Sequence, residues 1–271
     1  MAINYLKAIR PDGGPPAAAR RFGWRDPPRW SIERATRARS RREPRRDADI
    51  RSMPKVTSTT SVSVSDERAA LTAYARGVFT ASLAAKQAVL EGDCLDSLAA
   101  IAERLAAVLA GGGKLMICGN GGSAADAQHL AAELLVRLRP SVNRQGLPAI
   151  ALAMDSSTLT ACGNDYSYEA LFERMVDTLG QPGDALLGIT TSGRSPNVVR
   201  ALQAARRRGI VALGFLGQNG GPALEDCDLA FLAPSTETGR VQEIHITAGH
   251  ALMEMVENLL LKAGFLQLSP T

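Results

Sequence analysis

The stretch that decides the fold is KLMICGNGGSAADAQHLAAELLVRLR, from Lys114 to Arg139, in which a short apolar run ends in a glycine-rich turn and a helical pattern follows. This order predicts a backbone that comes close to an anion, because glycines remove side-chain bulk and the first N–H groups of a helix are unpaired. Glycine-rich turns also join strands to helices where no phosphate binds. The turn from Gly119 to Ser123 is therefore a candidate ligand site only if other residues converge on it.

The segments beyond this stretch repeat the same alternation. Four more short apolar runs follow, separated by helical patterns: AIALA at 149–153, ALLGIT at 185–190, IVALGFLG at 210–217 and DLAFLAP at 228–234. Ala- and Leu-rich patterns predict two helices before the sheet, over about 67–91 and 95–110, and a last helix over about 241–263. Short buried strands that alternate with amphipathic helices predict an α/β fold with a five-stranded parallel sheet flanked by helices.

The composition fits a folded protein with a substantial core, since 45% of the 271 residues are hydrophobic. No apolar stretch approaches the ~18 to 20 residues needed to span a bilayer, and the N-terminus has no signal-peptide core, so we expect a cytoplasmic protein without a membrane partner. The four cysteines show no CxxC spacing and are expected to be reduced and structural: Cys94, Cys118, Cys162 and Cys227.

The first segment differs from the rest in charge. Residues 1–55 contain 13 Arg and 2 Lys against 6 acidic residues, a net charge of +9, whereas the remaining 16 basic and 21 acidic residues give −5. Because residues 1–65 carry Pro and Arg runs without apolar periodicity, they are expected to be disordered, or to lie outside a native protein that starts at Met53. An Arg-rich arm for nucleic acid is the other interpretation. The folded domain is expected over 66–271.

Ligands of such sheets bind outside the C-terminal ends of the strands, near the point where the strand order reverses. After the run ALLGIT, four hydroxyls surround Gly193 just before a helix that begins at Pro196: those of Thr190, Thr191, Ser192 and Ser195. Hydroxyls and free N–H groups at a helix N-terminus form a phosphate cradle without a lysine. N-capping by Ser195 is the alternative interpretation, and the two are compatible.

His129 and Glu133 are spaced i, i+4, so they share one face of the helix that follows the glycine turn. The chain has only three histidines, and the other two, His245 and His250, both fall in the last predicted helix. With carboxylates nearby, these residues suit either metal binding, since neutral imidazole and carboxylate are zinc ligands, or paired acid and base catalysis.

Four motifs in order carry a resemblance to a known family: CGNGGSAADAQHLAAEL at 118–134, GNDYSYEALF at 163–172, ITTSGRSPNVVRAL at 189–202 and RVQEIHITAGH at 240–250. Together they resemble the phosphoheptose isomerases of the sugar isomerase (SIS) family, from about residue 75 to 261 and without the Arg-rich N-terminus. The resemblance implies an aldose–ketose isomerase that interconverts sedoheptulose 7-phosphate and D-glycero-D-manno-heptose 7-phosphate, the first step of ADP/GDP-heptose precursor synthesis. It also implies a Rossmann-like SIS fold and a homotetramer with active sites at subunit boundaries.

The resemblance further implies roles for individual residues. Glu133 becomes the general base that removes a proton from the sugar carbon beside the carbonyl, and His250 the acid that reprotonates the neighbouring position through an enediol. One zinc ion per subunit is implied, with four ligands: His129, Glu133, Gln242 and His250. Arg137 is implied to be a neighbour of the site. Substrate contacts, with the phosphate at the hydroxyl-rich turn, are implied for a larger set: Asn120, Gly121, Gly122, Ser123, Glu133, Asp165, Thr190, Thr191, Ser192, Ser195 and Gln242.

Two features complicate this assignment. Gln242 and His250 are eight residues apart, about 12 Å along a straight helix. Either the helix begins irregularly near Gln242, or a neighbouring subunit supplies one ligand. By helical spacing alone Glu243, seven residues before His250, is the better partner on that face. Gly239 stands where some relatives have an acidic residue, so one contact with the sugar, direct or indirect, is expected to be absent here.

Two other functions remain open at this point. A non-catalytic SIS protein that regulates replication initiation lacks the Glu and His pair, and the presence of both Glu133 and His250 argues against it. A sugar-phosphate-sensing module of a transcription regulator could take DNA affinity from the Arg-rich segment, but that segment contains no helix-turn-helix pattern. We therefore expect a phosphorylated seven-carbon sugar as the ligand and no nucleic acid.

Overall fold

The computed structural model of the chain describes residues 64–152 and 155–268. Its contacts divide the chain into residues 1–60 and 61–271, and all the described residues belong to the second unit. The predictions for the Arg/Pro-rich segment and for Met53 therefore lie outside the described residues. Within the second unit, helix α1 begins at Val64, close to the expected start of the folded domain.

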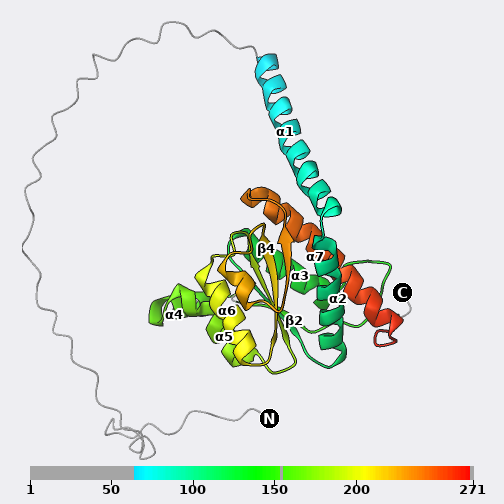
Figure 1. Cartoon of the computed structure of the whole chain (residues 1–271), viewed down its shortest axis with the longest axis vertical. Helices are drawn as coiled ribbons and strands as arrows, with labels where there is room; N and C mark the ends of the chain where they lie inside the picture. Colours follow the sequence, from blue (N-terminus) through cyan, green and yellow to red (C-terminus); the bar gives the residue numbers. More distant parts are fainter. Residues whose placement is uncertain (1–63, 153–154, 269–271) are drawn as a thin grey trace, which may run out of the picture. The chain divides into compact units, whose positions relative to one another are not determined.

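All five predicted strands are confirmed, and they form one sheet (Figure 1). The strands pair in parallel in the order β2-β1-β3-β4-β5. Their bounds are β1 (Leu115–Gly119), β2 (Ala149–Ala151), β3 (Ala185–Thr190), β4 (Val211–Gly217) and β5 (Leu229–Ala233). The order reverses between β1 and β3, because β2 lies on one side of β1 and the later strands lie on the other.

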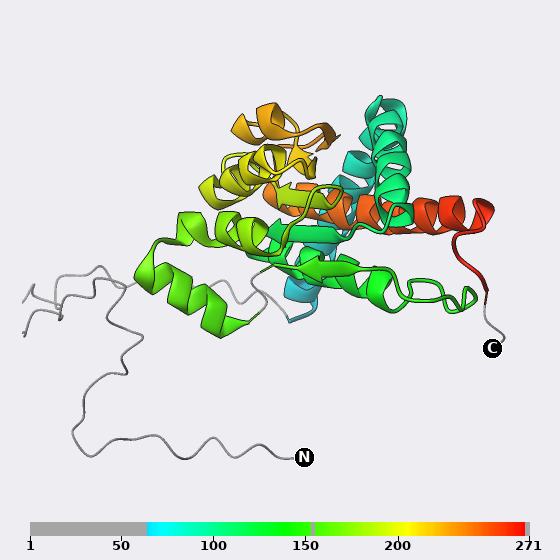
Figure 2. The same ribbon diagram turned by 90° about the horizontal axis from the view of Figure 1, so that it is seen from below.

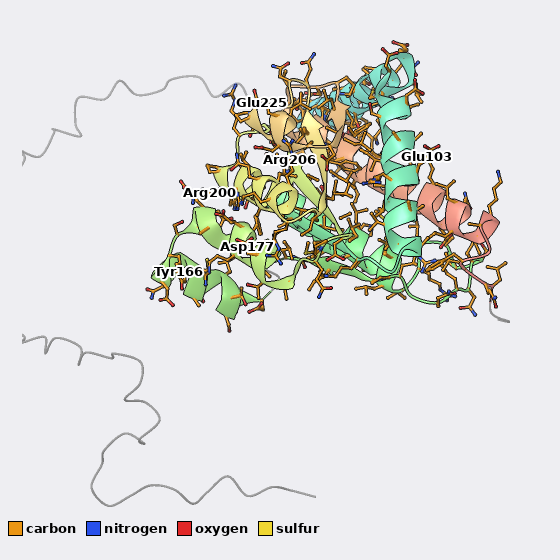
Figure 3. The ribbon with its side chains drawn as sticks, turned by 60° about the horizontal axis from the view of Figure 1, so that its bottom comes forward. Glu103, Tyr166, Asp177, Arg200, Arg206 and Glu225 are labelled. Atoms are coloured by element: carbon orange, nitrogen blue, oxygen red, sulfur yellow. The ribbon has the colours of Figure 1, made fainter. Side chains whose placement is uncertain are left out.

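Helices cover both faces of the sheet, as the continuous apolar runs of its strands require. In β1, Leu115 and Ile117 join one buried cluster, whereas Met116 and Cys118 join the other. The first cluster lies against α2 (Cys94–Ala110), α3 (Gly122–Leu135) and α7 (Thr238–Lys262), and the second lies against α5 (Leu171–Leu179) and α6 (Pro196–Arg207). Figure 2 shows α7 running along its side of the sheet, and Figure 3 shows Arg200 and Arg206 on the outer side of α6.

The segment between β2 and β3 contains helices, as the alternation of strands with helical patterns predicts. Helix α4 (Ser156–Asp165) lies in the segment after β2, and a short 3-10 helix, η3 (Tyr168–Ala170), follows it. The hydroxyl-rich start of α4 is typical of a loop, but the Asp155 side chain caps this helix by accepting a hydrogen bond of 2.7 Å from the Thr158 N–H. A second 3-10 helix, η4 (Pro222–Asp226), precedes β5.

The four cysteines are free thiols, as predicted. Burial raises the pKa of both Cys118 and Cys227 to about 12, so these thiols stay protonated and unreactive near neutral pH. Within the described ranges, no helix combines the length and the apolar character that crossing a membrane requires.

Helix α1 (Val64–Glu91) leaves its apolar side chains uncovered. None of its 28 residues is buried, and its N-terminal part extends away from the sheet layers in Figure 1. The large apolar residues exposed on it are Val64, Leu71, Tyr74, Val78, Phe79, Leu83 and Leu90. Its C-terminal end contacts α2 and α7, and Arg240 Nη1 of α7 donates a hydrogen bond of 2.7 Å to the Val78 carbonyl. Exposed apolar helix surfaces of this kind are typical of protein–protein contacts.

His245 of α7 lies in the core and fastens this helix to β4. Its side chain is almost completely buried, its ring centroid lies 5.8 Å from that of Phe215, and its Nε2 lies 3.1 Å from the Leu216 carbonyl oxygen. Among the described residues its Nδ1 has no partner. Burial, only partly offset by the hydrogen bond to Leu216, lowers the pKa of His245 to about 4.

This burial predicts a loss of stability in acid. The unfolded chain protonates His245 near pH 6.5, whereas the folded chain resists protonation down to about pH 4, so stability falls as the pH drops from 6.5 toward 4. His245→Gln should make the free energy of unfolding about 2 kcal/mol less sensitive to a change from pH 7.5 to pH 5 than in the parent. Urea unfolding of both proteins at the two pH values measures the difference. Equal pH dependence would contradict the assignment.

Candidate active site

The reversal of strand order brings the loops after β1 and β3 together. Asn120 of the first loop and Asn197 at the start of α6 exchange two amide hydrogen bonds of 2.8 Å each. They lie 77 positions apart in the chain, and the segment between them includes β2 and α4, so only the sheet order makes them neighbours. The glycine turn and the hydroxyl-rich turn that the sequence singled out therefore meet at one edge of the sheet, where ligands of such folds commonly bind.

The glycine turn is tightly folded onto the start of α3. Gly121 has a φ of +56°, which favours glycine, and the Ser123 N–H donates to the Asn120 carbonyl over 3.0 Å. Ser123 is buried. Gln242 of α7 lies directly over Gly122, where an added Cβ would come 2.5 Å from its Nε2. The side chain of Gln242 therefore packs against the glycine turn.

The hydroxyl-rich turn is packed closely against the loop after β4. Gly193 has a φ of +63°, and an added Cβ would collide with the Gly220 carbonyl oxygen. The hydroxyls of Thr190 and Ser195 lie 3.1 Å apart, and the exposed Ser192 accepts a hydrogen bond from the Arg194 N–H over 3.2 Å. Ser195 occupies the N-cap position of α6, but its side chain makes no capping hydrogen bond. The N-capping interpretation is therefore wrong for this hydroxyl, which faces Thr190 instead.

A second group of polar residues lies further along α3, where it meets α7. His129 Nε2 lies 2.7 Å from His250 Nε2 and 3.3 Å from Glu133 Oε1, and the three potential ligand atoms all lie within 4.8 Å of one another. We call these three residues the His–Glu cluster. Two imidazole nitrogens and a carboxylate oxygen are a donor set that suits zinc or proton transfer.

Asp126 adds a carboxylate that sequence reasoning missed, although its spacing of i, i+3 from His129 was a usable signal. One of its oxygens, Oδ2, is buried without a hydrogen-bond partner in the described structure. Burial raises the pKa of Asp126, and the nearby imidazoles of His129 and His250 oppose that shift. Asp126 therefore contributes to the electrostatics of the His–Glu cluster.

Within one chain the expected site is divided into two halves. Glu133 follows Gly122 by eleven residues, about 16 Å along the axis of α3. Gln242 precedes His250 by eight residues in α7, which is helical from Thr238 onward, so the expectation of an irregular start near Gln242 is wrong. The two turns and Gln242 form one half-site, and the His–Glu cluster forms the other.

Some expected residues lie outside both halves. Asp165 is exposed at the end of α4, where Asn164 Nδ2 donates to its carboxylate over 2.7 Å. Glu243, which helical spacing favours, pairs with Arg240 at 2.7 Å. Gly239 faces open space. Arg137 is exposed, close in sequence to Glu133, and donates to the Pro140 carbonyl over 3.5 Å.

A buried ion network holds the two helices of the His–Glu cluster together. Glu257 of α7 binds two arginines from the segment after α3, Arg139 and Arg144, and the side chains of Arg144 and Glu257 are 1% and 2% exposed. Arg144 also donates to the carbonyls of Glu133 and Leu134 over 3.0 and 3.1 Å. It therefore caps the end of α3 that carries Glu133. No local sequence pattern indicates this network, because charged residues in a loop are normally solvated.

The fold and the paired turns define the class of protein. The model of the SIS domain family matches residues 78–217, just over half of the chain. Phosphoheptose isomerases of Paramagnetospirillum magneticum and Chlorobaculum parvum are 54% and 52% identical to it, and each match covers 79% of the relative and 60% or 61% of this chain. The chain belongs to the phosphoheptose isomerase family, whose members are isomerases.

Solved structures agree with this placement. The phosphoheptose isomerase of Neisseria gonorrhoeae is 37% identical with a TM-score of 0.64, and the match covers 99% of that chain and 69% of this one. That of Francisella tularensis is 32% identical with a TM-score of 0.65, and the match covers 97% of that chain and 68% of this one.

The ion network predicts a large and specific loss of stability. Arg144→Met should lower the free energy of unfolding by about 3 kcal/mol, since it removes one partner of a buried ion pair together with the cap of α3. Lys114→Met is the matched control: its salt bridge to Asp184 lies elsewhere and is more exposed, with Lys114 29% accessible, so about 1 kcal/mol is expected. Denaturant midpoints measure both. A smaller loss for Arg144→Met than for the control would contradict the role of the network.

Proposed function

We propose that the chain interconverts sedoheptulose 7-phosphate and D-glycero-D-manno-heptose 7-phosphate, the first step in making activated heptose precursors. The observation that carries this proposal is the convergence of Glu133, His129 and His250 within 4.8 Å on helices that meet only in the folded chain. A carboxylate and two imidazoles at this distance can take and return protons. The names of the relatives support a seven-carbon sugar phosphate as the substrate.

The proposed reaction moves one carbon-bound proton between neighbouring carbons. Glu133 accepts the proton of the ketose C1, which leaves an enediol, and His250 delivers a proton to C2. The C1 hydroxyl gives up its proton as it becomes the aldehyde, and the former carbonyl oxygen gains one. Exchange with solvent returns Glu133 and His250 to their starting protonation states, since the cluster is open to water at His129, whose side chain is 46% exposed.

We further propose one zinc ion per subunit at the His–Glu cluster. Its donor set fits, because two imidazole nitrogens and one carboxylate oxygen are common zinc ligands and the three atoms lie close together. Gln242 completes the set only as Gln242 of the partner subunit, since in its own chain it lies over Gly122. When bound, such an ion supplies Lewis acidity to the sugar carbonyl.

The phosphate is assigned to the hydroxyl-rich turn. Thr190, Ser192 and Ser195 present hydroxyls beside Gly193, whose lack of a side chain lets the turn pack against the Gly220 carbonyl. Hydroxyl and backbone donors at a helix N-terminus suit an anion. The Asn120 amide stands at the junction with the glycine turn, where the carbon chain of the sugar begins.

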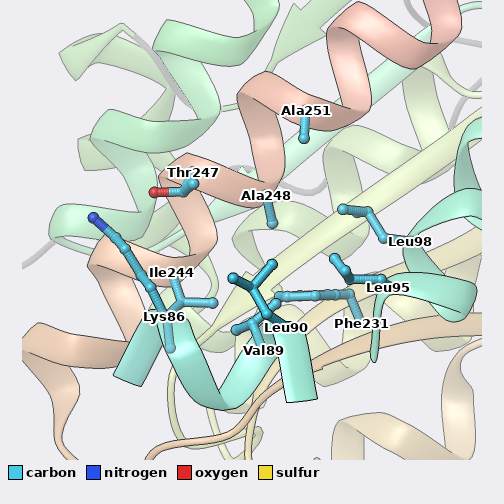
Figure 4. A pocket seen from close by; sticks show the side chains of 10 residues that line it. All are labelled: Lys86, Val89, Leu90, Leu95, Leu98, Phe231, Ile244, Thr247, Ala248 and Ala251. Atoms are coloured by element: carbon cyan, nitrogen blue, oxygen red, sulfur yellow. The ribbon is translucent and has the colours of Figure 1, made fainter. Parts of the chain in front are cut away.

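The separation of the two half-sites supports a site shared between subunits of a homotetramer. The carbon chain of a heptose spans roughly 9 Å, since it contains six bonds of about 1.5 Å, whereas the proposed base Glu133 lies about 16 Å beyond Gly122 along α3. The exposed apolar residues of α1 offer surface for such assembly. A cavity of about 180 Å³ beside the C-terminal end of α1 enlarges this apolar surface. Figure 4 shows its apolar lining, which includes Leu90, Leu95 and Phe231.

The proposed compartment is the cytoplasm. Reduced thiols persist there, and all four cysteines of the chain are free.

The base assignment is tested by Glu133→Gln. An amide cannot accept the proton, so turnover of sedoheptulose 7-phosphate should fall about a hundredfold to ten-thousandfold while the oligomer stays folded. Detection of the aldose product measures the rate, and elemental analysis of bound zinc separates lost proton transfer from lost ligation. Near-normal turnover would end the assignment.

The shared site is tested by mixing two defective subunits. Glu133→Gln damages one half-site and the double change Ser192→Ala/Ser195→Ala damages the other, so each variant alone should be nearly inactive. Co-expressed mixed oligomers should recover roughly a quarter of the parent activity, because random assortment brings two intact halves together across some interfaces. A site contained within one subunit predicts no recovery.

A further inference from the structure

The amide pair between Asn120 and Asn197 has a fixed orientation. Asn197 is 2% exposed, and its Oδ1 accepts a hydrogen bond of 3.0 Å from the Val198 backbone N–H, which can only donate. The oxygen of Asn197 is thereby identified, and its Nδ2 must be the atom that donates to Asn120 Oδ1 over 2.8 Å. The return bond, from Asn120 Nδ2 to Asn197 Oδ1, then fixes the amide of Asn120 as well.

Tyr168 completes the arrangement from a third element. Its hydroxyl, on η3, donates to Asn120 Oδ1 over 2.7 Å. The carbonyl oxygen of Asn120 therefore accepts two hydrogen bonds, which fills both of its lone pairs, and one of its two N–H bonds is used by Asn197. A single N–H of Asn120 is left for a ligand.

We propose that Asn197 and Tyr168 are positioning residues that hold Asn120 as a pure hydrogen-bond donor toward the substrate. The proposal deepens the proposed function and rests on it. This orientation determines which substrate group Asn120 can bind. Its free N–H donates to an oxygen that acts as a hydrogen-bond acceptor, such as a hydroxyl or phosphate oxygen of the substrate. A free asparagine could turn over and accept from a hydroxyl instead, and the pair with Asn197 forbids that alternative.

The orientation of the Asn120 amide matters for binding because of where the pair lies. Asn120 lies in the glycine turn and Asn197 in the first turn of α6, two residues after Ser195, so their pair links the proposed sugar contacts to the phosphate turn. If the Asn120 side chain adopted another rotamer, the hydrogen bond to the substrate would be lost, because hydrogen bonds weaken steeply as the donor–hydrogen–acceptor angle departs from linearity.

A double-mutant cycle separates positioning from mere support of the fold. Asn120→Ala and Asn197→Ala should each lower kcat/KM for sedoheptulose 7-phosphate about tenfold, mainly through KM. The double variant should be no worse than Asn120→Ala alone, since Asn197 acts through Asn120. Additive losses would show that Asn197 only supports the fold, and would overturn the proposal.

Tyrosine variants keep the test informative if Asn197→Ala does not fold. Tyr168 is half exposed, so Tyr168→Phe removes one hydroxyl without disturbing the core. It should raise KM about threefold in the parent and leave KM unchanged in the Asn120→Ala background. The matched control is Tyr166→Phe, two residues away at the outer end of α4, where Figure 3 shows its ring and where Arg174 stacks over it at 3.7 Å. A change of KM in the control equal to that of Tyr168→Phe would overturn the proposal.

A measurement without substrate distinguishes this inference from the proposed function. Amide hydrogen exchange of residues 119–124 should be several-fold faster in Tyr168→Phe and Asn197→Ala, and unchanged in Tyr166→Phe, because the pair holds the glycine turn. A parent protein that does not isomerise the heptose phosphate would refute the function, while the exchange pattern would still report on the pair. Unchanged exchange in both Tyr168→Phe and Asn197→Ala would refute the positioning role itself.

Discussion

The adjacency of β1 and β3 is the constraint on which the candidate substrate-binding edge depends. A parallel sheet must be covered on both faces, so the chain turns one way after β1 and the other way after β3, and the two loops are left side by side at the reversal. The glycine turn, the hydroxyl-rich turn and the Asn120–Asn197 pair all follow from this placement. The two turns could not meet, and the Asn120–Asn197 pair could not form, if β2 lay between β1 and β3.

The His–Glu cluster depends on a different constraint, the fixed spacing of α3 and α7. Glu257 lies two turns beyond His250, and its two arginines come from the segment that leaves α3. Arg144 binds the carbonyl of Glu133 itself, so the backbone of this residue is tied through one guanidinium to the helix that carries His250. A buried ionic network costs desolvation free energy, and here it supplies a defined geometry between two helices.

The sequence predicted the sheet well and the site unevenly, for physical reasons. Strands buried on both faces appear as continuous apolar runs, so all five could be recognised from local composition. The bounds of helix α4 were not predicted, because its hydroxyl-rich start depends on the Asp155 cap. The Arg144–Glu257 and His129–His250 contacts join residues 113 and 121 positions apart, and no local pattern records such pairings. Family resemblance supplied His250 as a site residue, whereas nothing indicated Asn197 or Tyr168.

Helix α1 also affects the order in which a newly made chain folds and assembles. It precedes the sheet in the chain yet contributes no buried residue, so the layers around the sheet can form without waiting for it. Covering its apolar side chains in the proposed oligomer requires a second molecule, and that step is bimolecular, with a rate that rises with protein concentration. In refolding, the spectroscopic signals of secondary structure would then return first and catalytic competence later, with a delay that shortens as more chains are present.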